Sequence, residues 1–195
     1  MSDTAGSSIC ESLNVWPVRL TAGGVHGWSL WFSGETDVLL ARGGRIPLFA
    51  SPEALLAAVS TTPEAFTLQG APRLGSVELR QVLDAHAASL DLDAAAEWFA
   101  RPEREADMAA CERALNAINM ATDIGATTGD DRISALITSD ALVGAFDALT
   151  FGQTLLGDGS PFRDNPVAMT SAITPDAAAL AVRLLTLAGH HLEAA

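Results

Sequence analysis

The chain contains no lysine and no tyrosine, so all of its 11 basic side chains are arginines. Aspartate and glutamate together number 24, which gives a formal charge of −13. A field of this sign repels phosphate groups, and this argues against nucleic acid and anionic membranes as the main partner. The charge leaves room for a basic partner protein, and equally for a surface that serves solubility alone.

Long apolar runs are also missing. No stretch approaches the roughly 18 apolar residues of a membrane-spanning helix. The first residues, Met1 to Ser8, are small and polar and lack the features of a secretory signal. We therefore expect a cytoplasmic protein in which residues 1–12 form a flexible start.

Cysteine is scarce, since the chain has only Cys10 and Cys111. Two cysteines at this separation provide neither a disulfide framework nor the spacing of a metal site. Cys10 falls in the expected flexible start, whereas Cys111 lies in a helical apolar pattern, where a free thiol packs as a small hydrophobic group. The sequence predicts no metal site, no cofactor and no catalytic residue.

Apolar side chains are abundant: hydrophobic residues make up 49% of the 195 residues, which is ample for a packed core. The length predicts a single domain spanning residues 1–195. Within it, residues 13–60 are expected to form a β-meander and a first helix, and residues 76–195 a helical part.

The first third of the chain alternates short apolar runs with glycine-containing joints, a pattern typical of antiparallel strands. The predicted strands are Val15–Thr21, Gly27–Phe32, Asp37–Arg42 and Arg45–Phe49. Ala22-Gly23-Gly24 is interpreted as a flexible connection, and Gly43-Gly44 as a two-residue hairpin turn. Pro47 lacks an amide donor, which predicts that the fourth strand lies at a sheet edge.

The rest of the chain is predicted to be mainly helical. Ser51, Pro52 and Glu53 supply the N-cap, the proline and the acid typical of a helix start. Further helices are predicted at Val77–Leu90, Asp93–Arg101, Glu105–Thr127 and Ser139–Leu156, and from Thr174 onward, with a turn-rich loop at Gly157–Pro166. Asp130 and Asp131 can cap a short helix that runs through Ile137. The fold class that follows is α+β, with an N-terminal four-stranded antiparallel β-meander packed against a mainly helical C-terminal part.

One polar stripe is a candidate ligand site. Glu112, Asn116, Asn119 and Asp123 recur at spacings of four, three and four, which places them on one face of the predicted Glu105–Thr127 helix. Two amides flanked by two acids are suited to a polar ligand or a hard cation. The same pattern is also that of the solvated side of an ordinary amphipathic helix.

The predicted sheet offers a second candidate, for partner binding. Trp28 and Trp31 face opposite ways, because side chains alternate along a strand, so both faces of the sheet carry bulky apolar groups. Either the chain's own helices cover both faces, or one face is kept for a partner. Arg42 and Arg45 flank the glycine turn and form a basic tip on an acidic protein. The candidate partner-binding residues are therefore Trp28, Trp31, Arg42 and Arg45.

The segment Arg45–Val59, with the sequence RIPLFASPEALLAAV, joins the fourth predicted strand to the first helix. It resembles a strand-to-helix segment of uncharacterised acidic actinobacterial proteins, some of which carry a primosomal label. The resemblance implies no activity, binding residue or cofactor, and the negative charge argues against a DNA-related role.

The predicted function is a non-catalytic cytoplasmic protein-interaction module that acts as an adaptor, a regulator or an inhibitor of a partner protein. The acidic field, the tryptophan-bearing sheet and an exposed strand edge at Arg45–Phe49 favour this interpretation. The alternative is a small-molecule-binding protein or an enzyme that uses the polar stripe. A third is a structural subunit of a larger assembly, and the sequence leaves the oligomeric state open.

Overall fold

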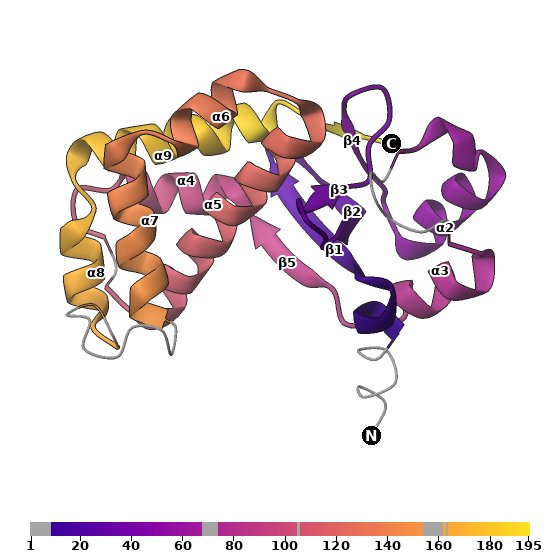
Figure 1. Ribbon diagram of the computed structural model, residues 1–195, viewed down its shortest axis with the longest axis horizontal. Coiled ribbons are helices and arrows are strands. Elements are labelled where there is room, and N and C mark those ends of the chain that lie inside the picture. The colour runs from indigo at the N-terminus through magenta and orange to yellow at the C-terminus, as the bar shows by residue number, and fades with distance from the viewer. Residues whose placement is uncertain (1–8, 68–73, 105, 154–161, 163) are drawn as a thin grey trace. The chain divides into compact units, whose positions relative to one another are not determined.

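The computed structural model describes residues 9–67, 74–104, 106–153, 162 and 164–195. The strands are β1 (Val15–Ala22), β2 (Val25–Phe32), β3 (Val38–Leu39), β4 (Ile46–Leu48), β5 (Ala88–Asp91) and β6 (Leu192–Ala194). The helices are α2 (Pro52–Thr61), the short 3-10 helix η1 (Pro63–Ala65), α3 (Ser76–Leu83), α4 (Leu92–Ala100), α5 (Met108–Thr128), α6 (Asp131–Ile137), α7 (Asp140–Gln153), α8 (Pro166–Ala172) and α9 (Pro175–Gly189). The predicted fold class is confirmed, because a strand-rich part precedes a mainly helical one (Figure 1).

The chain divides into two compact units. The first unit combines residues 1–90 with two later segments, 123–129 and 190–195. The second unit contains residues 91–122 and 130–189. The prediction of a single domain concerns independent folding, which this division does not test, and it stays a prediction.

The first unit is built on a four-stranded sheet with the strand order β3-β2-β1-β5. β1 and β2 form an antiparallel hairpin in which Ala22 pairs with Val25, so the turn consists of Gly23 and Gly24 alone. These glycines have φ values of 60° and 78°, as a type I′ turn requires. The predicted flexible connection is therefore a tight turn, and it sets the register of the whole hairpin.

The fourth predicted strand does not complete an antiparallel meander. β4 pairs with β6 in parallel, and next to it Phe49 bridges to Trp28 of β2. The strand pairing is thus mixed rather than purely antiparallel. The strand edge expected to be exposed at Arg45–Phe49 is occupied by β6, and β4 itself is buried. The predicted Gly43-Gly44 turn is present.

The core of the first unit lies between one face of the sheet and the helices α2 and α3, which pack side by side (Figure 1). Ser51 caps α2 as predicted, because its hydroxyl accepts a hydrogen bond from the Ala54 amide. Residues 9–13 are helical, and Cys10 is completely buried in this core. The expectation of flexibility is therefore wrong for Cys10, while residues 1–8 lie outside the described part.

The second unit is helical. α4 packs against α9, and α7 packs against both α8 and α9. The apolar stripe predicted for α5 is buried, including Cys111 and Ile118, and Asp130 caps α6 as expected. No described helix is long and apolar enough to cross a membrane by itself; the bent pairs α6–α7 and α8–α9 reach that length and composition only when taken together.

Two predicted segments differ in the structure. The helix expected over Val77–Leu90 ends at Leu83, and Ala88–Asp91 forms β5 at the edge of the sheet. The alanines of this segment favour a helix, but a free sheet edge offers ladder hydrogen bonds that outweigh a weak local preference. α8 was not predicted, and most of the expected loop Gly157–Pro166 lies outside the described residues.

Candidate functional site

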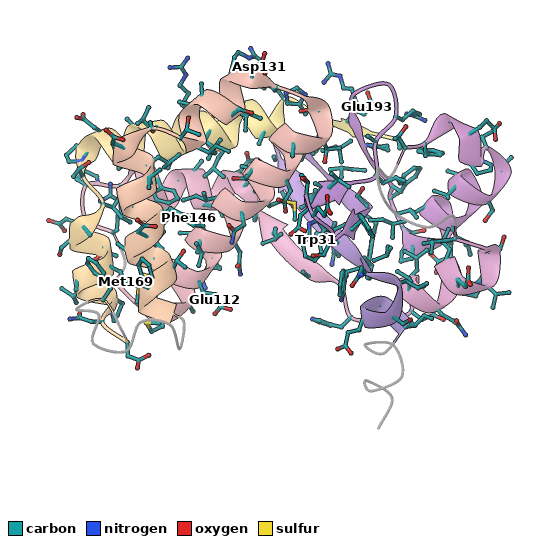
Figure 2. All side chains as sticks on the ribbon, in the orientation of Figure 1. Trp31, Glu112, Asp131, Phe146, Met169 and Glu193 are labelled. Atoms are coloured by element: carbon teal, nitrogen blue, oxygen red, sulfur yellow. The ribbon has the colours of Figure 1, made fainter. Side chains whose placement is uncertain are left out.

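The register of the first hairpin brings two tryptophans together. Trp16 on β1 pairs directly with Trp31 on β2, and their ring centroids lie 5.2 Å apart at an angle of 46°. Both side chains are partly exposed. Cross-strand aromatic pairs of this kind stabilise a hairpin, and partly exposed ones also offer a rigid apolar surface. We call Trp16 and Trp31 the tryptophan pair; Figure 2 labels Trp31.

The same register separates Trp28 from this pair. Trp28 lies opposite Arg19, and the guanidinium carbon of Arg19 is 5.4 Å from the centre of the Trp28 ring. Trp28 and Trp31 are three positions apart, so their side chains leave opposite faces of β2. Trp28 is only partly buried and packs against the core cluster under α2 and α3. The two tryptophans predicted as one partner surface therefore belong to two different faces.

A carboxyl group adjoins the tryptophan pair. The indole Nε1 of Trp31 donates a hydrogen bond to Oδ2 of Asp123, near the end of α5, at 3.0 Å. Burial raises the pKa of Asp123 to about 7, the hydrogen bond from Trp31 lowers it, and the nearby charge of Asp37 raises it. Asp123 therefore changes its charge near neutral pH.

Asp37 is fixed next to this group by its own loop. One of its carboxylate oxygens accepts hydrogen bonds from the Ser33 hydroxyl at 2.9 Å and from the Gly34 amide at 3.2 Å. One carboxyl group thus contacts Trp31 directly, and a second lies close enough to raise the pKa of the first. Carboxylates attract a cationic side chain, and aromatic faces bind one through cation–π contacts. This arrangement is chemically suited to a lysine or an arginine from another protein.

The predicted basic tip is tied to the end of the same chain. Arg42 forms an ion pair with Glu193 of β6 at 3.2 Å, and its guanidinium carbon lies 5.8 Å from the centre of the Phe66 ring. Arg45 donates a hydrogen bond to the main-chain carbonyl of His190. Both arginines are exposed, and Figure 2 labels Glu193. Their guanidinium groups thus hold the glycine turn to the C-terminal strand.

The structure places the residues of the polar stripe in different surroundings. Glu112, Asn116 and Asn119 are exposed on α5 within the second unit, and Figure 2 labels Glu112. Asp123 is partly buried and belongs to the first unit through its contact with Trp31. Whether the stripe binds a ligand is not tested by these positions and stays a prediction.

Sequence reasoning missed Trp16 as a member of the site. The signal was present, because a two-residue turn at Gly23-Gly24 fixes the pairing of Ala22 with Val25. Counting outward from that pair along both strands places Trp16 opposite Trp31. The contact of Trp31 with Asp123, which joins residues 92 positions apart, has no such local signal.

Comparison with known proteins identifies the family of the chain. Residues 15–165 match the family of the SatS C-terminal domain, which is well over half of the chain. The chain belongs to the SatS C-terminal domain family. The matched span includes the tryptophan pair and Asp123, but it ends before β6.

A solved structure of the same family shares this fold. It is titled "The crystal structure of SatS c-terminal domain in complex with bromine" and is 18% identical in sequence, with a TM-score of 0.58. The likeness covers 95% of this chain and 96% of that one. At this identity it establishes the fold alone. No curated protein matches the chain.

Proposed function

We propose that this member of the SatS C-terminal domain family is a non-catalytic cytoplasmic protein-interaction module. Its docking surface is the tryptophan pair with Asp37 and Asp123, and its partner presents a basic segment. The chain acts on that partner as an adaptor, a regulator or an inhibitor. We also propose that the chain is related to the acidic actinobacterial proteins that Arg45–Val59 resembles.

The observation that carries the proposal is the partly exposed tryptophan pair, in which Trp31 donates a hydrogen bond to a carboxyl group. Solvent-exposed aromatic pairs are enriched at protein interfaces, where they supply large contact areas at a low cost in conformational entropy. Asp37 and Asp123 are two of the 24 acidic residues that give the protein its formal charge of −13. A basic segment is therefore both steered toward the molecule and matched to this surface.

The test begins with affinity capture of the tagged full chain from extract of its host at moderate salt, followed by mass spectrometry. We expect one protein retained near stoichiometry by the parent chain and lost with Trp31→Ala. Trp28→Ala is the matched control, because it removes the same kind of side chain from the opposite face. We expect this control to keep the partner.

Binding is then measured with the purified partner and a peptide that carries its basic segment. Because a central aromatic anchor contributes about 2 kcal/mol or more, Trp31→Ala should weaken binding at least about tenfold. Replacing the basic residues of the peptide by glutamine should have a comparable effect. Equal retention by the Trp31→Ala and Trp28→Ala variants, or a partner without a basic segment, would contradict the proposal.

A further inference from the structure

The second unit contains an open groove that lies outside the tryptophan surface. Its volume is about 860 Å³, within the range of roughly 300 to 1,000 Å³ that small-molecule sites occupy. The end of α4 and the residues that follow it form one side, and residues from α8 to α9 form the other. We call it the Arg104 groove. It is distinct from the polar stripe, since Glu112, Asn116 and Asn119 do not line it.

Most of the residues that line the groove are apolar, although Arg101, Arg104, Thr170 and Ser171 also contribute. Phe99 and Ile173 are almost fully buried, and Ala178 and Val182 of α9 continue the same lining. Such walls favour the hydrocarbon part of a ligand, because removing apolar surface from water is favourable. Apolar walls alone, however, do not select a ligand.

The groove also contains the guanidinium group of Arg104, which has no anionic partner within the described part of the chain. Arg104 donates hydrogen bonds to the main-chain carbonyls of Phe99 at 3.1 Å and of Ile173 at 3.5 Å. Its Nε atom is buried and has no hydrogen-bond partner. Among the described residues no carboxylate pairs with Arg104. Burial accordingly lowers the pKa of this arginine.

A half-buried cation is costly when only neutral carbonyl groups solvate it. The two carbonyl oxygens use two of the five N–H donors of the guanidinium, so donors remain for a further acceptor. A carboxylate binds a guanidinium through two parallel hydrogen bonds and neutralises its charge. Arg101 also lines the groove, and its side chain is exposed to solvent. The field of this acidic protein repels a doubly charged phosphate monoester more strongly than a singly charged carboxylate.

We infer that the Arg104 groove binds an apolar molecule with a single carboxylate group. The carboxylate pairs with Arg104, and the apolar part lies along Phe99, Ile173 and α9. This site is independent of the docking surface proposed above, because its residues belong to the second unit. The two proposals can therefore fail separately.

Sodium octanoate is the probe, titrated into the isotopically labelled full chain and followed by two-dimensional NMR. We expect saturable shifts in the Arg104 Nε–H signal and in the amide signals of Ala178, Ala179 and Val182. Octanol has the same hydrocarbon chain without the charge, and we expect it to bind at least about tenfold more weakly, since a charge-assisted pair contributes 1.5 kcal/mol or more. Octyl phosphate tests the preference for a single charge.

Three variants locate the site. Arg104→Gln should abolish the preference for octanoate over octanol, whereas Arg113→Gln, which changes an exposed arginine of α5, should keep it. Ala179→Phe fills the groove from an exposed position of α9 and leaves Arg104 in place, so it should prevent binding without unfolding the chain. This variant keeps the test decisive if Arg104→Gln disturbs the fold.

Three results would overturn the inference. Equal affinities for octanoate and octanol would show that the guanidinium does not recognise the carboxylate. Unchanged octanoate binding to Ala179→Phe would place the ligand elsewhere. Tighter binding of octyl phosphate than of octanoate would contradict the assignment of a single negative charge. None of these results bears on the tryptophan surface.

Discussion

The side chain of Asp123 makes the stability of the first unit depend on pH. Burial raises its pKa from 3.8 to about 7, so the folded chain binds a proton there that the unfolded chain releases. The contribution of this group to stability is therefore fully present below about pH 4. It falls as the pH rises to about 7, and it is constant above that value.

The substitution Asp123→Asn tests the direction of this pH dependence. Asparagine keeps an oxygen that accepts the hydrogen bond from Trp31, but it does not ionise. We expect the melting temperature of the variant minus that of the parent to increase with pH. The increase between about pH 5 and about pH 8 should be about 4 °C or more. Asp147→Asn, at an exposed position of α7, serves as the control and should show no such trend. A constant difference across this pH range would mean that Asp123 does not titrate there.

Only part of the candidate site could be predicted from the sequence, and single residues show why. Trp31 and Asp123 were both selected, but for two separate sites, and the structure joins them by one hydrogen bond. Periodicity places a side chain on a face of its own helix or strand. It carries no information about which distant element meets that face, and so neither this contact nor the neighbourhood of Asp37 was predictable.

At the scale of elements, strand β2 approaches the end of β4 more closely than a side chain allows. The amides and carbonyls of Trp28 and Phe49 exchange hydrogen bonds of 2.8 Å and 2.9 Å. A Cβ atom at Gly27 would lie 2.6 Å from the carbonyl oxygen of Phe49 and 2.9 Å from the carbonyl carbon of Leu48. These are main-chain atoms, which cannot move aside without breaking the ladder.

Gly27→Ala should therefore destabilise the chain by about 1 to 3 kcal/mol, measured by urea unfolding. Gly144→Ala is a matched control, because a Cβ atom at this position of α7 meets nothing within 4 Å. In a helix this change should instead stabilise the protein by about 0.5 to 1 kcal/mol. Equal effects of the two substitutions would mean that β2 and β4 are not held at the distance described.

The elements predicted correctly are those with local signals. The glycine-containing joint at residues 22–24 separated the predicted strands that correspond to β1 and β2, and the caps at Ser51 and Asp130 marked the starts of α2 and α6. β5 and the partner of β4 were missed, because strand pairing is settled by distant residues and not by the preferences of the strand itself. The sequence thus predicted a four-stranded sheet that contained Arg45–Phe49, whereas the fourth strand of the sheet is β5.

The whole molecule carries a large excess of negative charge. Arginines supply 11 positive charges against 24 acids, so most carboxylates have no cation to offset them. Repulsion among like charges destabilises a compact state, and salt screens it over a distance of about 10 Å at 0.1 M. Surface ion pairs such as Arg42–Glu193 contribute little stabilisation to offset this repulsion.

Added salt should therefore stabilise the protein near neutral pH. We expect the melting temperature at about pH 7.5 to rise by a few degrees between about 50 mM and about 500 mM sodium chloride. The rise should shrink near the isoelectric point of about 4.4, where the excess charge is neutralised. A melting temperature that falls with salt at pH above neutrality would show that attractive pairs dominate the surface.

The parallel pairing of Ile46, Pro47 and Leu48 with Leu192, Glu193 and Ala194 has a consequence for biosynthesis. A ribosome makes the chain from its N-terminus, so β4 emerges long before the strand that completes it. Through most of translation the apolar side chains of Ile46 and Leu48 have no β6 to pair with. Closing so long a loop is entropically costly, which delays this pairing further. The last step in folding the first unit must therefore wait until β6 has been synthesised.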